Sequence, residues 1–195
     1  MLLRRFVRLA LLMITMFAMS VGLATSASAA TAHKSSTVDI DGGNTALTVA
    51  AGTLKVLTDN GVKVTPIKGA SASGRTFTFP ITDGDVDATT LAGTIKHSGG
   101  LQIAAGGKKL RVQDFVIDTR KSVLTVRISG THTRLALLDL NLKNAHISKG
   151  KTQIVVSDVH ASLTGTAAAA LNKKFGVSLF KKGLAIGTAK VTARP

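Results

Sequence analysis

The sequence of 195 residues contains no cysteine, no tryptophan, no tyrosine and no glutamate. Without cysteine the chain cannot form disulfides or carry a lipid on a cysteine, so its core alone must hold the fold together. The lack of glutamate, beside many Thr, Val and Gly residues, disfavours surface helices and suits strands and turns. With seven Phe and no nucleic-acid recognition motif, nucleic acid is a poor candidate partner.

The charge is strongly of one sign. The formal net charge is +15, and it becomes +12 when three N-terminal arginines are set aside. Such a balance favours anionic partners through long-range attraction. Outside the cell these are wall polymers, lipid head groups or a carboxylate-bearing ligand, and a merely solubilising surface is the alternative interpretation.

The first thirty residues differ from the rest and predict export. Arg4, Arg5 and Arg8 precede an apolar run over residues 9–24, which ends in the small-x-small pattern of residues 27–29. This is the anatomy of a secretory signal peptide, and we favour it over a retained membrane anchor because no stop-transfer charges follow. We therefore expect a signal peptide at 1–29, a flexible N-terminus at 30–36 and one domain at 37–195. We expect the protein to be secreted, either free outside the cell or associated with the cell wall.

The mature part alternates apolar and polar residues with a period of two, which is typical of half-buried strands. Gly-rich turn signals separate these runs at a spacing of roughly ten residues. The pattern predicts an all-β protein, an antiparallel β-sandwich or barrel-like fold with one or two short helices. The alternating apolar positions are Val62 and Val64; Phe77, Phe79 and Ile81; Leu124, Val126 and Ile128; and Leu138, Leu140 and Leu142.

Two stretches depart from this rhythm: residues 50–60 predict a short helix or a turn, and residues 163–176 are the better helix candidate. In residues 50–60 apolar side chains recur every three residues, and Gly61 follows. Residues 163–176 contain an alanine run after Thr164 and Thr166, either of which can cap a helix, and they end at Gly176. Leu171 and Phe175, four residues apart, would face the sheet.

The sequence shows no catalytic motif, so we expect a protein that is not an enzyme. It has no nucleophile elbow, no paired zinc-binding histidines and no phosphate-binding glycine loop. Asp83, Asp85 and Asp87 alternate and would share one face of a strand, but Ala88 and Thr94 stand where a calcium loop needs glycine and glutamate. A polar strand edge is the favoured interpretation of these aspartates.

His97 is the histidine of most interest. It lies where a strand should end in a tight glycine turn, and it shares a face with Ile95, so it would point toward apolar surroundings. A neutral imidazole there can ligate iron or bond to a carboxylate, although the pattern alone favours a half-buried histidine bonded to a backbone carbonyl.

Two segments carry a resemblance to a known family. Residues 74–81 (GRTFTFPI) and 93–101 (GTIKHSGGL), together with the alanine-rich region 163–188, resemble the HtaA-type haem-binding domain of secreted and surface proteins of Gram-positive bacteria. The resemblance spans roughly residues 37–193 and implies a β-rich fold, export and haem as the ligand.

The resemblance also implies site residues. In that family a tyrosine ligates the iron and the histidine of the glycine turn supports it; His97 stands at that histidine, but the chain has no tyrosine. Haem would then be bound differently, for example through His97 itself, or the fold was kept and the ligand lost. The candidate cofactor-binding residues are His97, Phe77, Phe79 and Lys96, with Lys108, Lys109 and Arg111 able to meet propionates. The alternative function is a cell-envelope-associated structural protein that binds anionic polymers without a cofactor.

Overall fold

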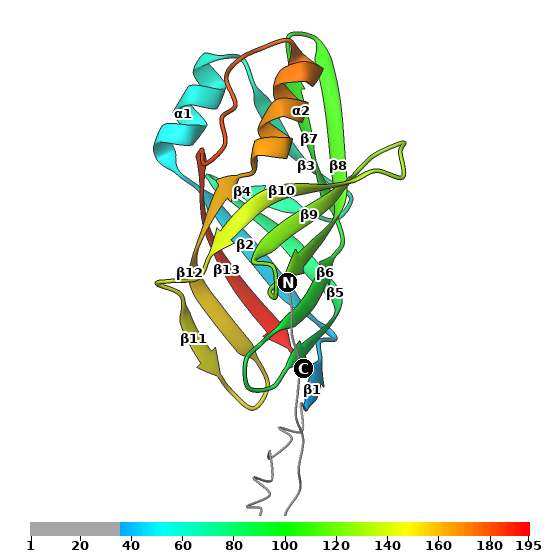
Figure 1. Cartoon of the computed structure of the whole chain (residues 1–195), viewed down its shortest axis with the longest axis vertical. Coiled ribbons are helices and arrows are strands. Elements are labelled where there is room, and N and C mark those ends of the chain that lie inside the picture. The colour runs from blue at the N-terminus through cyan, green and yellow to red at the C-terminus, as the bar shows by residue number, and fades with distance from the viewer. Residues whose placement is uncertain (1–35) are drawn as a thin grey trace, which may run out of the picture. The chain divides into compact units, whose positions relative to one another are not determined.

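A computed structural model describes residues 36–195 (Figure 1). The predicted signal peptide at 1–29 lies outside the described residues, as does almost all of the predicted flexible segment at 30–36. The first strand begins at Thr37.

The described chain forms thirteen strands and two helices. In chain order they are β1 (Thr37–Asp39), β2 (Gly42–Val49), α1 (Ala51–Asp59), β3 (Lys63–Ile67), β4 (Ser71–Ser73), β5 (Thr76–Asp87), β6 (Gly93–His97), β7 (Gly100–Ala105), β8 (Lys108–Asp118), β9 (Val123–Ile128), β10 (Arg134–Asn141), β11 (His146–Lys149), β12 (Ile154–Leu163), α2 (Gly165–Phe175) and β13 (Ala185–Arg194).

Eight antiparallel strands close into a ring. The pairing runs β5-β2-β13-β12-β10-β9-β8, and β6 closes the ring because it pairs with both β8 and β5. The remaining strands extend this barrel: β7 and β3 continue from β8, β11 pairs with β12, and β1 and β4 pair with β5. The predicted all-β antiparallel fold is therefore confirmed, in its barrel-like form.

The alternating apolar residues of the sequence face the inside of the barrel. Phe77, Phe79 and Ile81 of β5 are all buried, and Val126 of β9 is fully enclosed. The prediction is less accurate on β10, which ends at Asn141, so Leu142 lies beyond the strand. Alternation gave the buried face correctly because a period of two places successive side chains on opposite faces.

Both predicted helices are present, and they lie at one end of the barrel, opposite the C-terminus (Figure 1). The start of α2 is capped by the Thr164 hydroxyl, which accepts from the Ala167 N–H, and the end is capped by Gly176 in the left-handed conformation at φ 72°. The helix packs against β10 and β8, with Leu171 and Phe175 buried as expected. The buried hydroxyl of Thr53 fixes α1 to β13 by donating to the Ala185 carbonyl.

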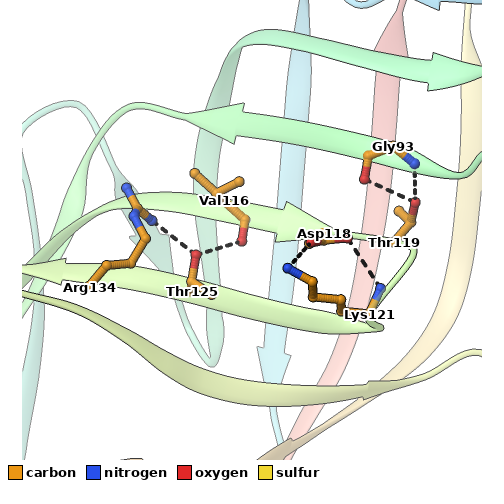
Figure 2. Close-up of polar contacts among 7 residues, drawn as sticks. All are labelled: Gly93, Val116, Asp118, Thr119, Lys121, Thr125 and Arg134. Carbon is orange, nitrogen blue, oxygen red and sulfur yellow. Dashed lines mark hydrogen bonds and ion pairs between the residues drawn. The ribbon is translucent and has the colours of Figure 1, made fainter.

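Side-chain hydrogen bonds reinforce the pairing of β6 with β8 (Figure 2). The Thr119 hydroxyl, just after β8, accepts from the Gly93 N–H at 2.7 Å and donates to the Leu91 carbonyl at 2.7 Å. The Thr119 N–H in turn donates to the Gly93 carbonyl at 3.0 Å. The start of the closing strand is therefore held by the turn that follows its neighbour.

The β8–β9 hairpin has its own polar clamps, also visible in Figure 2. The Asp118 carboxylate accepts from the Lys121 N–H at 3.2 Å and lies 3.4 Å from the Lys121 ammonium. Arg134 of the next strand, β10, donates to the Thr125 hydroxyl of β9 and to the Asp114 carbonyl of β8, both at 3.0 Å. These bonds span a register shift between β8 and β9, where an extra residue bends the strand.

Within residues 36–195, neither helix has the length and apolar character that a membrane crossing requires.

The barrel closure leads to a prediction about Gly93. A Cβ placed on Gly93 would overlap the Asp85 carbonyl oxygen and lie 2.7 Å from the Cα of Val86, so β6 could not pair closely with β5. We expect Gly93→Ala to lower the free energy of unfolding by about 3 kcal/mol, measured by urea denaturation.

Gly52→Ala is the matched control. A Cβ at Gly52, on α1, would meet nothing within 4 Å. Because alanine is the better helix former, this variant should gain up to about 1 kcal/mol. Equal stability of the two variants would contradict the assigned role of β6.

Candidate functional site

The interior of the barrel contains a cavity of about 660 Å³. Its lining is almost entirely apolar and comes from most of the ring strands, including Phe77, Phe79, Val191 and Leu138. Most polar side chains on the wall carry hydroxyls, such as Thr45 and Thr119; Lys63 is its one charged residue, and no carboxylate of the described residues lines it. A cavity of this kind binds a ligand by its apolar surface rather than by charge.

The cavity reaches the surface at both ends of the barrel. At the helical end its lining includes Leu54 and Leu57 of α1 and the exposed residues Thr58, Gly61 and Lys63. At the opposite end the lining includes exposed Thr90 and Ile147, and Ile147 is 53% exposed. A ligand can therefore enter without unfolding of the barrel.

His97 lies inside the barrel wall and is only 4% exposed. Its Nε2 is 2.7 Å from the Thr45 hydroxyl of β2, and its Nδ1 is 3.3 Å from the Phe115 carbonyl of β8. The carbonyl can only accept, so Nδ1 carries the proton and Nε2 accepts from Thr45. The imidazole thus links three ring strands and has both nitrogens hydrogen-bonded.

Burial keeps this imidazole neutral. Loss of solvation lowers the pKa of His97 to about 4, against a weaker opposing effect of its hydrogen bonds to backbone carbonyls. A neutral imidazole is the form that ligates metals, but its free lone pair, on Nε2, is already engaged by Thr45.

Aromatic rings lie beside His97. Phe115 supplies its carbonyl to the imidazole, and the Phe115 ring packs against Phe79 with centroids 4.7 Å apart at 41°. Phe77 lines the same cavity from β5. Phe77 and Phe79 therefore line the cavity, whereas His97 is not among its lining residues and lies within the wall beside Phe115.

Lys96 lies elsewhere. It precedes His97 on β6, so its side chain leaves the opposite, outer face of the strand. There its ammonium forms an exposed ion pair with Asp83 at 2.8 Å, and the hydrogen bond to Asp83 raises the pKa of Lys96. Arg111 is also engaged, since its Nε donates to the Gln102 side chain at 3.0 Å.

Neither Thr45 nor α1 was identified as part of a site from the sequence. Thr45 is 52 residues from His97, and no local pattern links the two. The only signal was indirect: a buried histidine requires a partner for each nitrogen. Within the part of the chain that the structure describes, no group of three His or Asp side chains is placed to hold a metal ion.

The fold matches that of solved HtaA and HtaB structures from Corynebacterium glutamicum. The C-terminal domain of HtaA is 16% identical at a TM-score of 0.64, with 80% of this chain and 98% of that chain covered. The N-terminal domain of HtaA is 13% identical at a TM-score of 0.55, covering 80% and 97%. Heme binding protein HtaB is 13% identical at a TM-score of 0.50, covering 82% and 96%.

These likenesses show that the chain has an HtaA-type fold. No family model matches the sequence, and a search of curated proteins gave no match.

The burial of His97 predicts how stability depends on pH. The unfolded chain has a histidine pKa near 6.5, so between about pH 6.5 and 4 the unfolded state binds a proton that the folded state does not. Stability from this group is present above pH 6.5 and is lost as the pH falls toward 4. We expect the free energy of unfolding to fall by on the order of 3 kcal/mol in total, and urea unfolding at several pH values across this range measures the fall.

His97→Gln should remove this part of the pH dependence. The exposed His160 provides the control, since His160→Gln should leave the profile unchanged. An NMR titration that places the pKa of His97 at 6 or above would show that the imidazole is not buried in this way.

Proposed function

We propose that this protein is a secreted binding protein that holds an apolar ligand inside its barrel, with haem as the first candidate. The observation that supports this most directly is the cavity of about 660 Å³. Its size falls within the range of roughly 300–1,000 Å³ that is typical of small-molecule sites. A ligand that occupies it would remove apolar surface from water, and a ligand that binds only the folded state stabilises the fold.

Haem is the first candidate because of the fold. HtaB, one of the similar structures, is named as a heme binding protein, and the segments at 74–81 and 93–101 resemble haem-binding domains. We infer that the apolar wall, including Phe77 and Phe79, would contact the porphyrin. Export through the predicted signal peptide would place the protein where it meets such a ligand, and nothing in the proposal requires catalysis.

The described residues do not offer a strong ligand for the haem iron. The chain contains no tyrosine, and His97 would reach an iron only if Thr45 released its Nε2. We therefore propose that the porphyrin surface, and not the iron, supplies the binding energy. This assigns His97 to support of the barrel wall rather than to ligation.

Hemin and iron-free protoporphyrin IX distinguish these modes. If apolar contact dominates, the two compounds should bind within about tenfold of each other, a difference of at most about 1.4 kcal/mol. The two affinities are measured by titration, followed by absorbance for hemin and by fluorescence for protoporphyrin. The rise in melting temperature provides a second measure for both compounds. Binding of hemin alone, with a Soret shift that His97→Ala abolishes, would instead identify His97 as an iron ligand.

A cavity-filling variant tests the location. Ala189 of β13 lines the cavity, so Ala189→Leu should weaken the binding of both porphyrins by about tenfold or more. Ala185→Leu, at an exposed position on the same strand, is the matched control and should bind as the parent protein does. If neither porphyrin binds the parent protein, haem is removed as the ligand; if the two variants bind equally, the cavity is removed as the site.

The rival function is attachment to anionic envelope polymers without a cofactor. The net charge favours it, since the formal +15 of the chain remains +12 without the three arginines of the predicted signal peptide. It predicts salt-sensitive retention on isolated cell wall together with no porphyrin-induced stabilisation, because exposed charges are screened beyond about 10 Å at 0.1 M salt.

A further inference from the structure

Five lysines gather at the helical end of the barrel, and we call them the basic end. Lys63 of β3 and Lys109 of β8 both lie opposite Ala104 of β7, so they flank the same residue on adjacent strands. Lys108 extends its ammonium to Gly176, which caps α2. Lys173 and Lys174 occupy the last turn of that helix. All five are exposed.

The positive charge of the basic end is not neutralised. Within residues 36–195, none of the five lysines takes part in an ion pair. Asp59 of α1, at the same end of the barrel (Figure 1), pairs with Lys55 at 2.8 Å. Unpaired like charges at one end of the barrel repel one another, and such a concentration of positive charge attracts an anionic partner.

Aspartates collect at the other end of the barrel. Asp39 of β1 pairs in register with Asp85 of β5, Asp85 with Thr94 of β6, and Thr94 with Asp118 of β8. Asp83 and Asp87 lie on the same stretch of β5. Asp83 and Asp118 pair with Lys96 and Lys121, so this end of the described domain carries both signs of charge, whereas no ion pair neutralises the basic end.

The basic end also carries apolar surface and an opening. Val177 directly follows Gly176 and is 37% exposed, among Lys108, Lys173 and Lys174. Lys63 belongs both to the basic end and to the lining of the cavity. A hydrophilic polyanion would gain nothing from Val177 or from the opening, whereas an anionic lipid surface has both head-group charge and apolar depth.

We propose that the basic end docks on a membrane surface rich in anionic lipids. Docking would bring the cavity opening beside Lys63 to the lipid, where apolar ligands partition. The choice of lipid over polymer rests in part on the proposed function, because it uses the cavity opening. The docking itself can be measured without any cavity ligand.

The experiment uses vesicles of phosphatidylcholine with and without phosphatidylglycerol, and the processed protein recovered from the medium of an exporting host. The protein should sediment with the anionic vesicles at low salt and be released as salt is raised. Neutral vesicles should not bind it. Lys108→Gln/Lys173→Gln/Lys174→Gln should weaken binding to anionic vesicles by about a hundredfold, since each lysine near such a surface contributes about fivefold.

The matched control removes the same charge elsewhere. Lys143, Lys151 and Lys190 are exposed on other parts of the barrel, so their triple Gln variant should bind almost as the parent protein does. No vesicle binding, or equal loss in both variants, would overturn the proposal. Binding to polyphosphate or isolated cell wall but not to vesicles would assign the basic end to a polymer instead.

Porphyrin titration separates this inference from the proposed function. The double variant Lys173→Gln/Lys174→Gln leaves the cavity lining and the candidate propionate partners Lys108, Lys109 and Arg111 intact, so it should bind hemin and protoporphyrin as the parent protein does. Vesicle docking without porphyrin binding would retain the basic end and remove haem, and the reverse result would remove only the docking surface.

Discussion

The closure of the sheet through β6 is the constraint on which the rest of this structure depends. A strand of five residues completes the ring, and it does so because Gly93 allows close approach to β5 while Thr119 holds it against β8. Closure removes two exposed sheet edges and encloses the apolar faces of eight strands around one interior. The cavity, its aromatic wall and the burial of His97 all follow from that enclosure.

His97 shows how the same closure limits chemistry. It is the last residue of β6, and its imidazole joins β6 to β2 through Thr45 and to β8 through the Phe115 carbonyl. A buried nitrogen without a partner is costly, so each of these bonds adds to the pairing of the ring strands. The arrangement that stabilises the wall also occupies the lone pair that an iron ion would need.

Local patterns in the sequence were sufficient for the elements but not for the site. Alternation at Phe77, Phe79 and Ile81, and the Thr164 and Gly176 caps, depend on neighbouring residues and were predicted correctly. The same period of two also predicted that His97 points to the same face of its strand as Ile95. Its bond to Thr45 depends on register between distant strands, and the void depends on how large side chains fill a closed ring, neither of which a single sequence specifies.

The placement of the surface charges likewise depends on contacts between residues that are distant in the sequence. The net charge predicted an anionic partner but did not indicate which part of the surface would bind it, because Lys63, Lys109 and Lys174 are far apart in the sequence. Lys173 and Lys174 also complement the negative end of the α2 dipole, so helix stability explains part of their placement. The same explanation covers Lys108, whose ammonium lies beside Gly176, but it does not extend to Lys63 and Lys109. The fold brings both sets to the end where the cavity opens, so surface charge and interior chemistry are parts of one arrangement.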